Sequence, residues 1–396
     1  MVVSAATIAD AMARERLALL AGFFLGSFAW NVCWPFLPLR VQELGVGSLA
    51  EVARVSGFLA GGSQLITAFL APWWSLLGER YGYRRQIIRA HLGMGAAMAA
   101  IGLARVPLEL IGAGAMLGAL GGNYPHYMAL VAMRAAPSDV GRAIGDLQAA
   151  GQLGATLGPL LGGFVASQFG VGAAFVTSLA ISAFSAILIL SFVTPDDRSA
   201  RTRATSGGIR AALVDPRQRW LMALLVVGDS GIQGLRPLIP VVIASRVGDN
   251  PSVVAAVTGL VATLVTGGGV LSAIVVGRVA RRAHPRSILR VTLPIACLLA
   301  ASIPLTDGLP ELIVIWTLLG VTGGALSPCV FGWLGRHATG GGGFALLAST
   351  SMLGFAIGPA VMGQLTVYGM EWPFRGAAIS TALAAILVMA RRERAI

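Results

Sequence analysis

Three polar residues, Asp229, Gln233 and Arg236, lie within one otherwise apolar stretch of the chain. Their spacing of four and then three residues places them on one face of a helix. An ionisable side chain at bilayer depth costs roughly 2.5–3.5 kcal/mol on insertion scales, so such a residue is a functional candidate by default. Because lipid would not accept this face, we expect it to point toward a central cavity.

Asp229 is the candidate proton carrier on this face, with Arg236 as its partner. Burial disfavours the charged form of a carboxylate, and a nearby arginine favours it. We expect these opposed effects to keep the carboxylate titratable near neutral pH, which a proton carrier requires. A structural Asp229–Arg236 network without proton traffic fits the same pattern, since buried charges also serve as scaffolding. A further acid, Asp146, lies one turn after Arg142, and we interpret these two as a local ion pair.

A second polar group, Asn123–Tyr127, follows two glycines in another apolar stretch. Its proline frees a backbone carbonyl, and its polar and aromatic side chains are suited to the wall of a substrate-binding site. His126 could relay protons, although a lone histidine in a membrane helix is as often simply hydrogen-bonded. The candidate substrate contacts are polar or aromatic residues of this group and of other apolar stretches: Trp30, Asn31, Asn123, Tyr127, Gln152 and Gln233.

The chain offers no clustered catalytic set, because its four histidines are scattered and no HxxxD, HExxH or paired-carboxylate pattern occurs. All 29 basic residues are arginines, which excludes a lysine nucleophile or a phosphate-loop lysine. The three cysteines have neither metal-ligand nor redox spacing, and we expect them to be small core residues. We therefore expect no enzyme, no metal and no cofactor; an integral-membrane acyl- or phosphotransferase is the less favoured alternative.

The composition places these residues in a membrane. Of the 396 residues, 56% are hydrophobic and 12% are charged, and the mean hydropathy is +0.78. A soluble protein carries roughly 25% charged residues, so this chain could not cover a water-exposed surface. Apolar runs of about 20 residues can each span a bilayer. The sequence predicts twelve: Leu17–Leu39, Ala50–Trp74, Gln86–Ala104, Leu108–Met133, Val140–Ala166, Val171–Val193, Gln218–Val242, Ser252–Val276, Ser287–Leu305, Glu311–Leu334, Gly342–Thr366 and Arg375–Ala390.

The arginines predict the orientation of these spans. With the N-terminus inside, most of them, including Arg84, Arg85 and Arg89, fall in cytoplasmic segments. Both termini are then cytoplasmic, and the net charge of +12 is explained without nucleic acid. We expect a multi-pass protein of the bacterial inner (cytoplasmic) membrane with the lipid bilayer as its partner, and aromatics such as Trp74 as anchors at the membrane interface.

The two halves of the chain resemble each other. Trp34–Pro38 matches Arg236–Pro240 at an offset of 202 residues, and the pair Gly158-Pro159 recurs as Gly358-Pro359 at an offset of 200. Parallel six-helix repeats related by an axis along the membrane normal are typical of rocking transporters. The predicted domains are an N-terminal six-helix bundle (1–194), a cytoplasmic linker loop (195–217) and a C-terminal six-helix bundle (218–396).

A glycine-rich motif carries the sharpest resemblance to a known family. Gly154, Gly158, Pro159, Gly162 and Gly163 satisfy the pattern GxxxGPxxGG at every fixed position. Glycine at every fourth residue lets a neighbouring helix approach closely, and proline permits a bend; ordinary small-residue packing is the simpler alternative. On this motif the chain resembles the major facilitator superfamily, in its drug–proton antiporter branch. The resemblance implies an all-α membrane fold with twelve transmembrane helices in two pseudo-symmetric six-helix bundles.

The loop after the second span resembles the cytoplasmic gating motif of the same family, GxLADRxGRR. In the family, a carboxylate and basic residues of this loop latch the halves when the cavity faces outward. A basic loop that only sets topology is the alternative. The family also carries a helix 4 arginine tied to proton coupling, and the stretch 111–122 of this chain has no charge. The residues that match or replace the gating motif here are Glu79, Arg80, Gly82, Arg84 and Arg85.

The sequence therefore predicts a secondary transporter that works by alternating access and exports amphipathic small molecules in exchange for protons. A proton gradient is the expected energy source and a monomer the expected state. Proton binding at Asp229 would neutralise the cavity and release the substrate outward. It would also permit the transporter to return to its other conformation. The alternative is an uptake symporter or facilitator for a small metabolite, which Arg236 favours if that metabolite is an anion.

Overall fold

The computed structural model describes residues 5–135, 139–196, 214–248, 250–280, 282–335 and 341–391, and these ranges fold into helices without a strand. We refer to the elements before residue 197 as the first half and those after residue 213 as the second half. The first half contains α1 (Ala5–Cys33), η1 (Trp34–Phe36), α2 (Leu37–Glu43), α3 (Leu49–Tyr81), α4 (Tyr83–Leu103), α5 (Pro107–Leu120), α6 (Tyr124–Arg134), α7 (Val140–Phe169) and α8 (Val171–Phe192).

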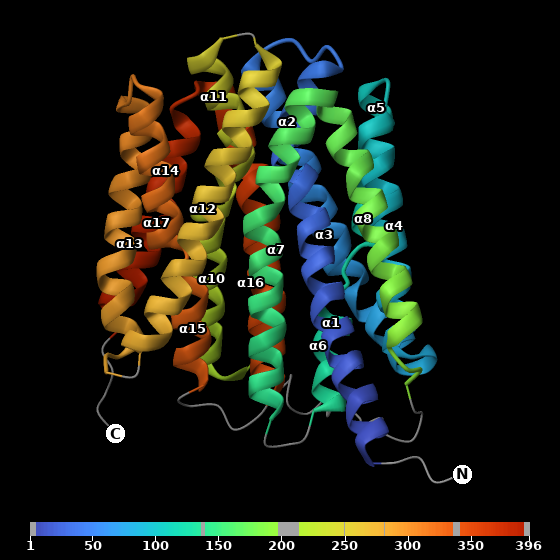
Figure 1. The fold of residues 1–396 in the computed structure, drawn as a ribbon. Coiled ribbons are helices and arrows are strands. Elements are labelled where there is room, and N and C mark those ends of the chain that lie inside the picture. Colours follow the sequence, from blue (N-terminus) through green and yellow to red (C-terminus); the bar gives the residue numbers. More distant parts are fainter. Residues whose placement is uncertain are drawn as a thin grey trace.

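The second half repeats this order. It contains α10 (Pro216–Gly234), η3 (Arg236–Leu238), α11 (Ile239–Val247), α12 (Pro251–Val279), α13 (Pro285–Ser302), η4 (Ile303–Leu305), α14 (Leu309–Gly323), α15 (Leu326–Gly335), α16 (Gly341–Leu365), η5 (Thr366–Tyr368) and α17 (Trp372–Ala390). The start of α1 and the end of α17 lie at the same end of the molecule (Figure 1).

Nine helices in the described ranges are long and apolar enough to cross a membrane. The other three predicted spans fall on α4, on α5 with α6, and on α10 with α11. The helix α4 carries three arginines, and the other two spans are interrupted near their middle. The predicted membrane fold is confirmed in class, and the count of twelve remains a prediction.

The interruptions follow from glycine and proline. Gly122 has a φ of +81°, which favours glycine, between the end of α5 and the start of α6. A 3-10 turn with proline at its second position ends α1, and the same turn ends α10. These turns, η1 and η3, begin 202 residues apart, so the repeat seen in the sequence is also a repeat of the backbone.

Each half is a bundle of long helices packed side by side. In the first half α1 packs along α7 and α4 along α8, and in the second half α10 packs along α16 and α13 along α17. Two helix pairs join the halves, α3 with α16 and α7 with α12 (Figure 1). We call the contact made by these two pairs the seam.

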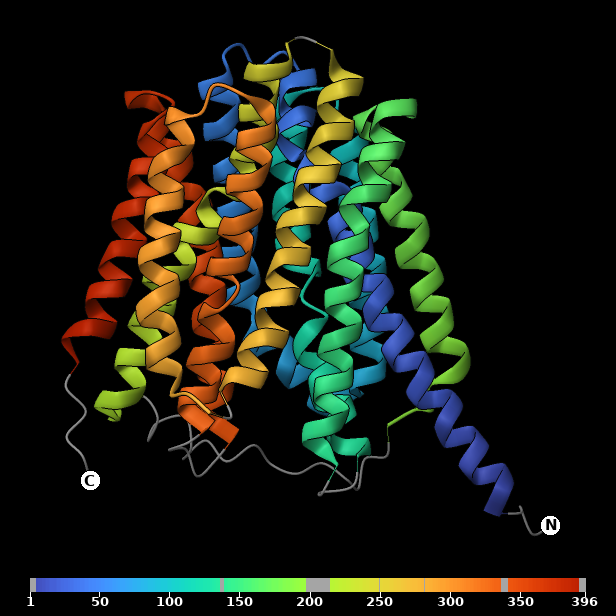
Figure 2. The ribbon, with the colours of Figure 1, turned by 60° about the vertical axis from the view of Figure 1, so that its left-hand side comes forward.

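The seam is tight at the end of the molecule away from the start of α1. There a Cβ added to Gly163 would lie 2.9 Å from Cα of Gly259, and Thr366 Oγ1 donates a hydrogen bond to the carbonyl of Ala50 at 3.0 Å. At the other ends of α7 and α12, a Cβ added to Gly145 or Gly277 would meet nothing within 4 Å. The halves therefore diverge toward the end where α1 begins (Figure 2).

Candidate functional site

Asp229 lies within the contact between α10 and α16, with 2% of its surface exposed. Ser351 Oγ donates a hydrogen bond to Asp229 Oδ2 at 2.6 Å. A Cβ added to Gly354, one turn further along α16, would lie 2.7 Å from Asp229 Cβ. The carboxylate is thus enclosed between two helices of the second half. The expectation that this helix face points toward a central cavity therefore does not hold for Asp229 itself.

Arg236 does not continue the helix face of Asp229, because α10 ends at Gly234 and Arg236 opens the turn η3. Its side chain is exposed, whereas Gln233 is half-buried. Within the described ranges Arg236 makes no hydrogen bond and no ion pair, so the predicted Asp229–Arg236 pair is not formed there. The two charges remain near enough to influence each other electrostatically.

The matched turns η1 and η3 both reach the opposite half. η1 contacts α11 and α12, and η3 contacts α2 and α3. Trp34 opens η1 at the position that Arg236 occupies in η3, and its ring packs against Trp30 with the centroids 4.6 Å apart. Both tryptophans are half-buried. Equivalent positions of the two halves therefore hold an aromatic pair and a guanidinium.

The glycine motif packs α7 on two neighbours. A Cβ added to Gly154, Gly158 or Gly162 would collide with atoms of α1 and η1 between residues 24 and 36. Pro159 and Gly163 instead face α12, where Gly259 is the contact. The motif therefore positions α7 against α1 and against the other half at the same time.

The second half repeats this arrangement. Gly358 of α16 packs on the backbone of Ser230 and Gly234 of α10, and the carbonyl of Pro359 lies against Gly57 of α3. α16 thus holds Asp229 through its contact with α10 and reaches the first half through its contact with α3. Asp229 does not lie in the seam, but it contacts a helix that forms part of the seam.

Tyr127 is fully buried and takes part in a polar network of the first half. His91 Nε2 lies 2.8 Å from Tyr127 Oη and 3.1 Å from Ser185 Oγ. This position corrects the expectation that Tyr127 forms part of a binding wall. The sequence signal for this network is the spacing of Ser178, Ser182 and Ser185, which lie on one face of α8 and indicate a buried polar partner.

His126 is also buried, at 1% exposure, and neither of its ring nitrogens has a hydrogen-bond partner in the part of the chain that the structure describes. Its ring packs near Tyr83, with the centroids 6.3 Å apart. Among the other predicted contacts, Asn31 donates its side-chain amide to the carbonyl of Ser27 at 2.8 Å, Asn123 is half-buried and Gln152 is exposed. The structure does not gather the predicted contacts into one lined pocket.

The interruption between α5 and α6 is capped by side chains from α3 and α4. Thr67 and Trp74 donate hydrogen bonds of 2.9 Å to the carbonyls of Gly118 and Ala119. Arg89 Nη1 donates one of 3.0 Å to the carbonyl of Leu120, and its guanidinium lies 3.5 Å from the centroid of the Trp74 ring. Trp74 and Arg89, expected at the interface and in a cytoplasmic segment, both cap a helix end, and their expected positions in the membrane stay predictions.

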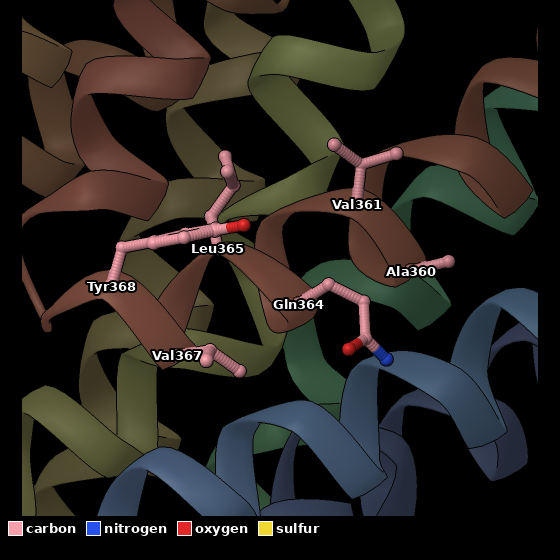
Figure 3. A pocket seen from close by; sticks show the side chains of 6 residues that line it. All are labelled: Ala360, Val361, Gln364, Leu365, Val367 and Tyr368. Atoms are coloured by element: carbon pink, nitrogen blue, oxygen red, sulfur yellow. The ribbon is translucent and has the colours of Figure 1, made fainter.

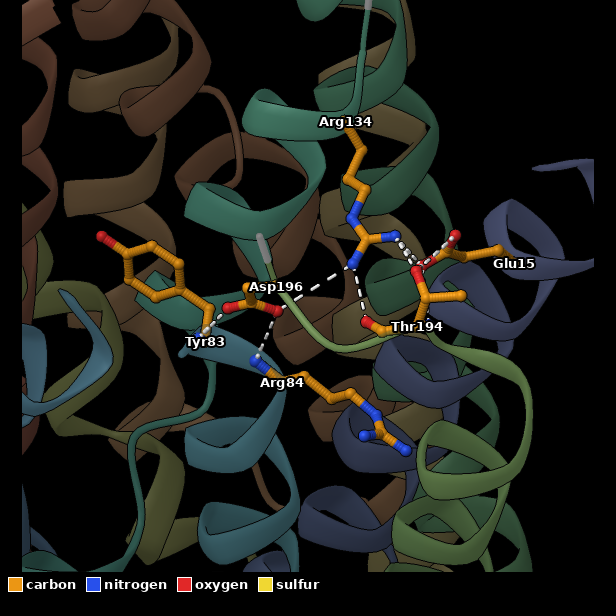
Figure 4. Close-up of polar contacts among 6 residues, drawn as sticks. All are labelled: Glu15, Tyr83, Arg84, Arg134, Thr194 and Asp196. Carbon is orange, nitrogen blue, oxygen red and sulfur yellow. Dashed lines mark hydrogen bonds and ion pairs between the residues drawn. The ribbon is translucent and has the colours of Figure 1, made fainter. Parts of the chain in front are cut away.

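The gating loop joins a polar network within the first half (Figure 4). Gly82, with a φ of +100°, separates α3 from α4, and the carboxylate of Asp196 accepts hydrogen bonds from the backbone amides of Tyr83 and Arg84. Arg134 lies 3.9 Å from Asp196 and also pairs with Glu15. Asp196, placed by the sequence in the linker, is thus the carboxylate that holds the start of α4, whereas Glu79, Arg80 and Arg85 are exposed.

Asp146 forms its ion pair with Arg16 of α1. The expectation of a local pair with Arg142 is wrong, because α1 extends beyond the apolar run and brings Arg16 beside α7. Both side chains are partly exposed, so the pair contributes little to stability.

A pocket of about 520 Å³ lies along the end of α16 and along η5 (Figure 3). It is lined by residues of a single segment, and Gln364 is the polar side chain whose amide points toward α3. None of the predicted contacts lines it. Its lining residues are Ala360, Val361, Gln364, Leu365, Val367 and Tyr368.

A family model described as the Major Facilitator Superfamily matches residues 19–338. The chain belongs to this superfamily. Multidrug resistance protein MdtG from Citrobacter koseri is 31% identical over 313 residues, which cover 78% of this chain and 77% of that protein. The protein of the same name from Serratia proteamaculans is 30% identical over 325 residues, which cover 80% of this chain and 78% of that protein.

Solved structures show the same fold. A bacterial homologue of the human lysosomal transporter Spinster, in an inward-facing and occupied conformation, superposes with a TM-score of 0.74 at 15% identity, covering 95% of each chain. Its inward-facing, unoccupied conformation gives a TM-score of 0.73. The family and the all-α membrane fold expected from the sequence are confirmed, and the chain is a multi-pass membrane protein.

Proposed function

We propose that this major facilitator protein is a secondary transporter that exports amphipathic small molecules in exchange for protons. The relatives named Multidrug resistance protein MdtG support export of this class of compound. The observation that carries the coupling is the buried carboxylate of Asp229, bonded to Ser351 on the helix that also packs across the seam. A proton gradient is the energy source, and no cofactor enters the cycle.

The proposed coupling runs through α16. A charged Asp229 accepts the Ser351 hydroxyl and holds α10 against α16. Protonation removes the charge that strengthens this bond, so α16 is freer to shift against α3 at the seam. Such a link between one titrating group and a helix with two packing arrangements is how a local charge change drives a global transition. His126 and Arg236 were the other predicted coupling residues, and Arg236 is the one near enough to influence Asp229 electrostatically.

The wider organisation is part of the proposal. Residues 1–194 and 218–396 act as two rocking bundles, joined by a cytoplasmic linker at 195–217. Both termini face the cytoplasm of a bacterial inner membrane, and the chain acts as a monomer. The seam closes the outer side in this conformation, and the divergent ends of α7 and α12 open to the cytoplasm.

Transport by Asp229→Asn in proteoliposomes tests the coupling. Under an imposed pH gradient the wild type should concentrate ethidium or 2-naphthoate, and the variant should lose this uphill transport at least about tenfold. Exchange of the same probe at equal pH should persist, because the variant lacks only the titrating group. Asp307→Asn is the matched control, since that side chain is fully exposed. If Asp229→Asn concentrates the probe as well as the wild type does, the assignment of Asp229 fails.

The direction of proton movement separates this proposal from an uptake symporter. Substrate added to the purified protein in weakly buffered detergent solution should release protons, as exchange requires. Proton uptake on addition of substrate would instead support symport, and the unpaired Arg236 would then favour an anionic metabolite.

A further inference from the structure

We propose that Arg236 is an anion-binding subsite, which takes the carboxylate, sulfonate or phosphate group of an amphipathic ligand whose apolar part packs on Trp30 and Trp34. The inference rests on the proposed function and names its substrate class. It also assigns Arg236 to ligand binding in place of its predicted role beside Asp229.

The first observation is that this guanidinium is unsatisfied. Arg236 lies between the two segments of one predicted span, its side chain is exposed, and it makes no ion pair or hydrogen bond within the described ranges. An arginine inside a membrane normally pairs with an acid or with backbone carbonyls. The guanidinium presents five donors in a planar fork that matches a carboxylate or phosphate.

The second observation is that no acid of the surrounding elements forms an ion pair with it in the described ranges. Among the helices that contact η3, α11 and α16 carry no carboxylate, and α10 carries only Asp229, which Ser351 engages. On α2, Glu43 pairs with Arg40 at 2.6 Å. On α3, Glu51 caps its own helix with Ser48, and Glu79 lies at the far end. Asp229 acts on Arg236 electrostatically but forms no ion pair with it in the described ranges, which leaves the guanidinium donors free for an external anion.

The third observation is the chemistry of the equivalent position in the first half. η3 contacts helices of the first half, and η1 contacts helices of the second, so both turns lie where the halves meet. Trp34 opens η1, and its half-buried ring is in contact with the half-buried ring of Trp30, one turn earlier in α1. Aromatic side chains supply apolar contact area at little cost in conformational entropy. One half thus offers an apolar surface and the other a fixed positive charge, which together fit an amphipathic anion.

Equilibrium binding to the protein in phosphatidylcholine nanodiscs tests the subsite. The probes share one ring system and differ in charge: 2-naphthoate, 2-naphthalenemethanol and 2-naphthylmethylammonium. Arg236→Gln should weaken 2-naphthoate binding by roughly tenfold to a hundredfold, since hydrogen bonds to charged groups are the strong ones, and leave the neutral probe nearly unchanged. Arg236→Lys should restore part of the affinity, because it keeps the charge and loses the fork. Arg219→Gln, an exposed position near the start of α10, is the matched control.

Each outcome decides the inference. If Arg236→Gln binds 2-naphthoate as the wild type does, or loses the neutral probe equally, the subsite is wrong. If phosphatidylglycerol in the nanodisc displaces 2-naphthoate from the wild type, the subsite stands and takes a lipid headgroup. Binding through Arg236 without gradient-driven transport would overturn the proposed function alone. Transport of all three probes with unchanged selectivity in Arg236→Gln would overturn this inference alone.

Discussion

At the scale of single residues, the buried polar groups divide between bonded and unbonded side chains. His91 and Asp229 each have a partner on another helix, whereas both nitrogens of His126 are without one in the described ranges. A buried polar group without a hydrogen-bond partner lowers the stability of the fold by about 1–3 kcal/mol. The effect of such a group on stability therefore depends on whether it has a partner. This distinction was invisible in the sequence, because His91 and His126 look alike there and differ only in what the fold places beside them.

Tyr127→Phe should lower the stability of the protein in detergent by about 1–3 kcal/mol. The substitution keeps the ring, which is fully buried against Phe23, and removes the hydroxyl that meets His91 at 2.8 Å. His91 then retains only the longer contact to Ser185. Thermal unfolding followed by circular dichroism measures the change. Tyr81→Phe is the control, because Tyr81 is exposed, and equal unfolding temperatures for both variants would contradict the prediction.

At the scale of elements, the interruption of the fourth predicted span shows how neighbouring helices can cap a helix end. Lipid offers no hydrogen bond to a free carbonyl, so an interrupted helix needs donors from its neighbours. Thr67, Trp74 and Arg89 donate to three consecutive carbonyls at the end of α5. The stacked tryptophan and arginine also place a positive charge at the negative end of the α5 dipole.

Thr67→Val should destabilise this capped end by about 1 kcal/mol or more, because the isosteric side chain cannot donate to Gly118. Thr156→Val is the matched control, since the Thr156 hydroxyl bonds only to its own helix, at Gln152. Hydrogen exchange of the backbone amides of α6 in nanodiscs measures the difference. Faster exchange should appear in the first variant alone, and identical exchange in both would exclude a capping role for Thr67.

The sequence was sufficient for the elements that depend on local chemistry. The glycine motif predicted close helix contacts, and the repeated proline turns appear as η1 and η3 at the expected offset. It was insufficient where a partner lies far along the chain. Asp146 pairs with Arg16, 130 residues away, and Asp196 holds the start of α4 across 113 residues. Such contacts depend on how helices pack, which periodicity and composition do not encode.

At the scale of the whole molecule, the seam is the surface that must open and close during alternating access. Its two helix pairs are equivalent under the repeat, because each carries a Gly-Pro pair whose proline carbonyl faces a glycine of the other half. Pro159 faces Gly259 and Pro359 faces Gly57. Backbone contact of this kind is possible only without a side chain, so the closed seam is strongly sensitive to a single added carbon.

Gly57→Ala should therefore open the seam. Its Cβ would collide with the carbonyl of Pro359, and overpacking of this kind typically costs about 1–3 kcal/mol. A penalty confined to the closed seam shifts the conformational equilibrium by roughly 5- to 150-fold. Double electron–electron resonance between spin labels on Arg54→Cys and Val367→Cys, in a background without the native cysteines, should show a larger population at long distance.

Gly62→Ala provides the control on the same helix, because a Cβ there would meet nothing within 4 Å. Its distance distribution should match that of the parent protein, which excludes a general effect of alanine on α3. Since the closed seam is one of the two states that a rocking transporter must visit, Gly57→Ala should also slow exchange transport even without a gradient. An unchanged distance distribution in Gly57→Ala would mean that the contact with Pro359 does not hold the halves together.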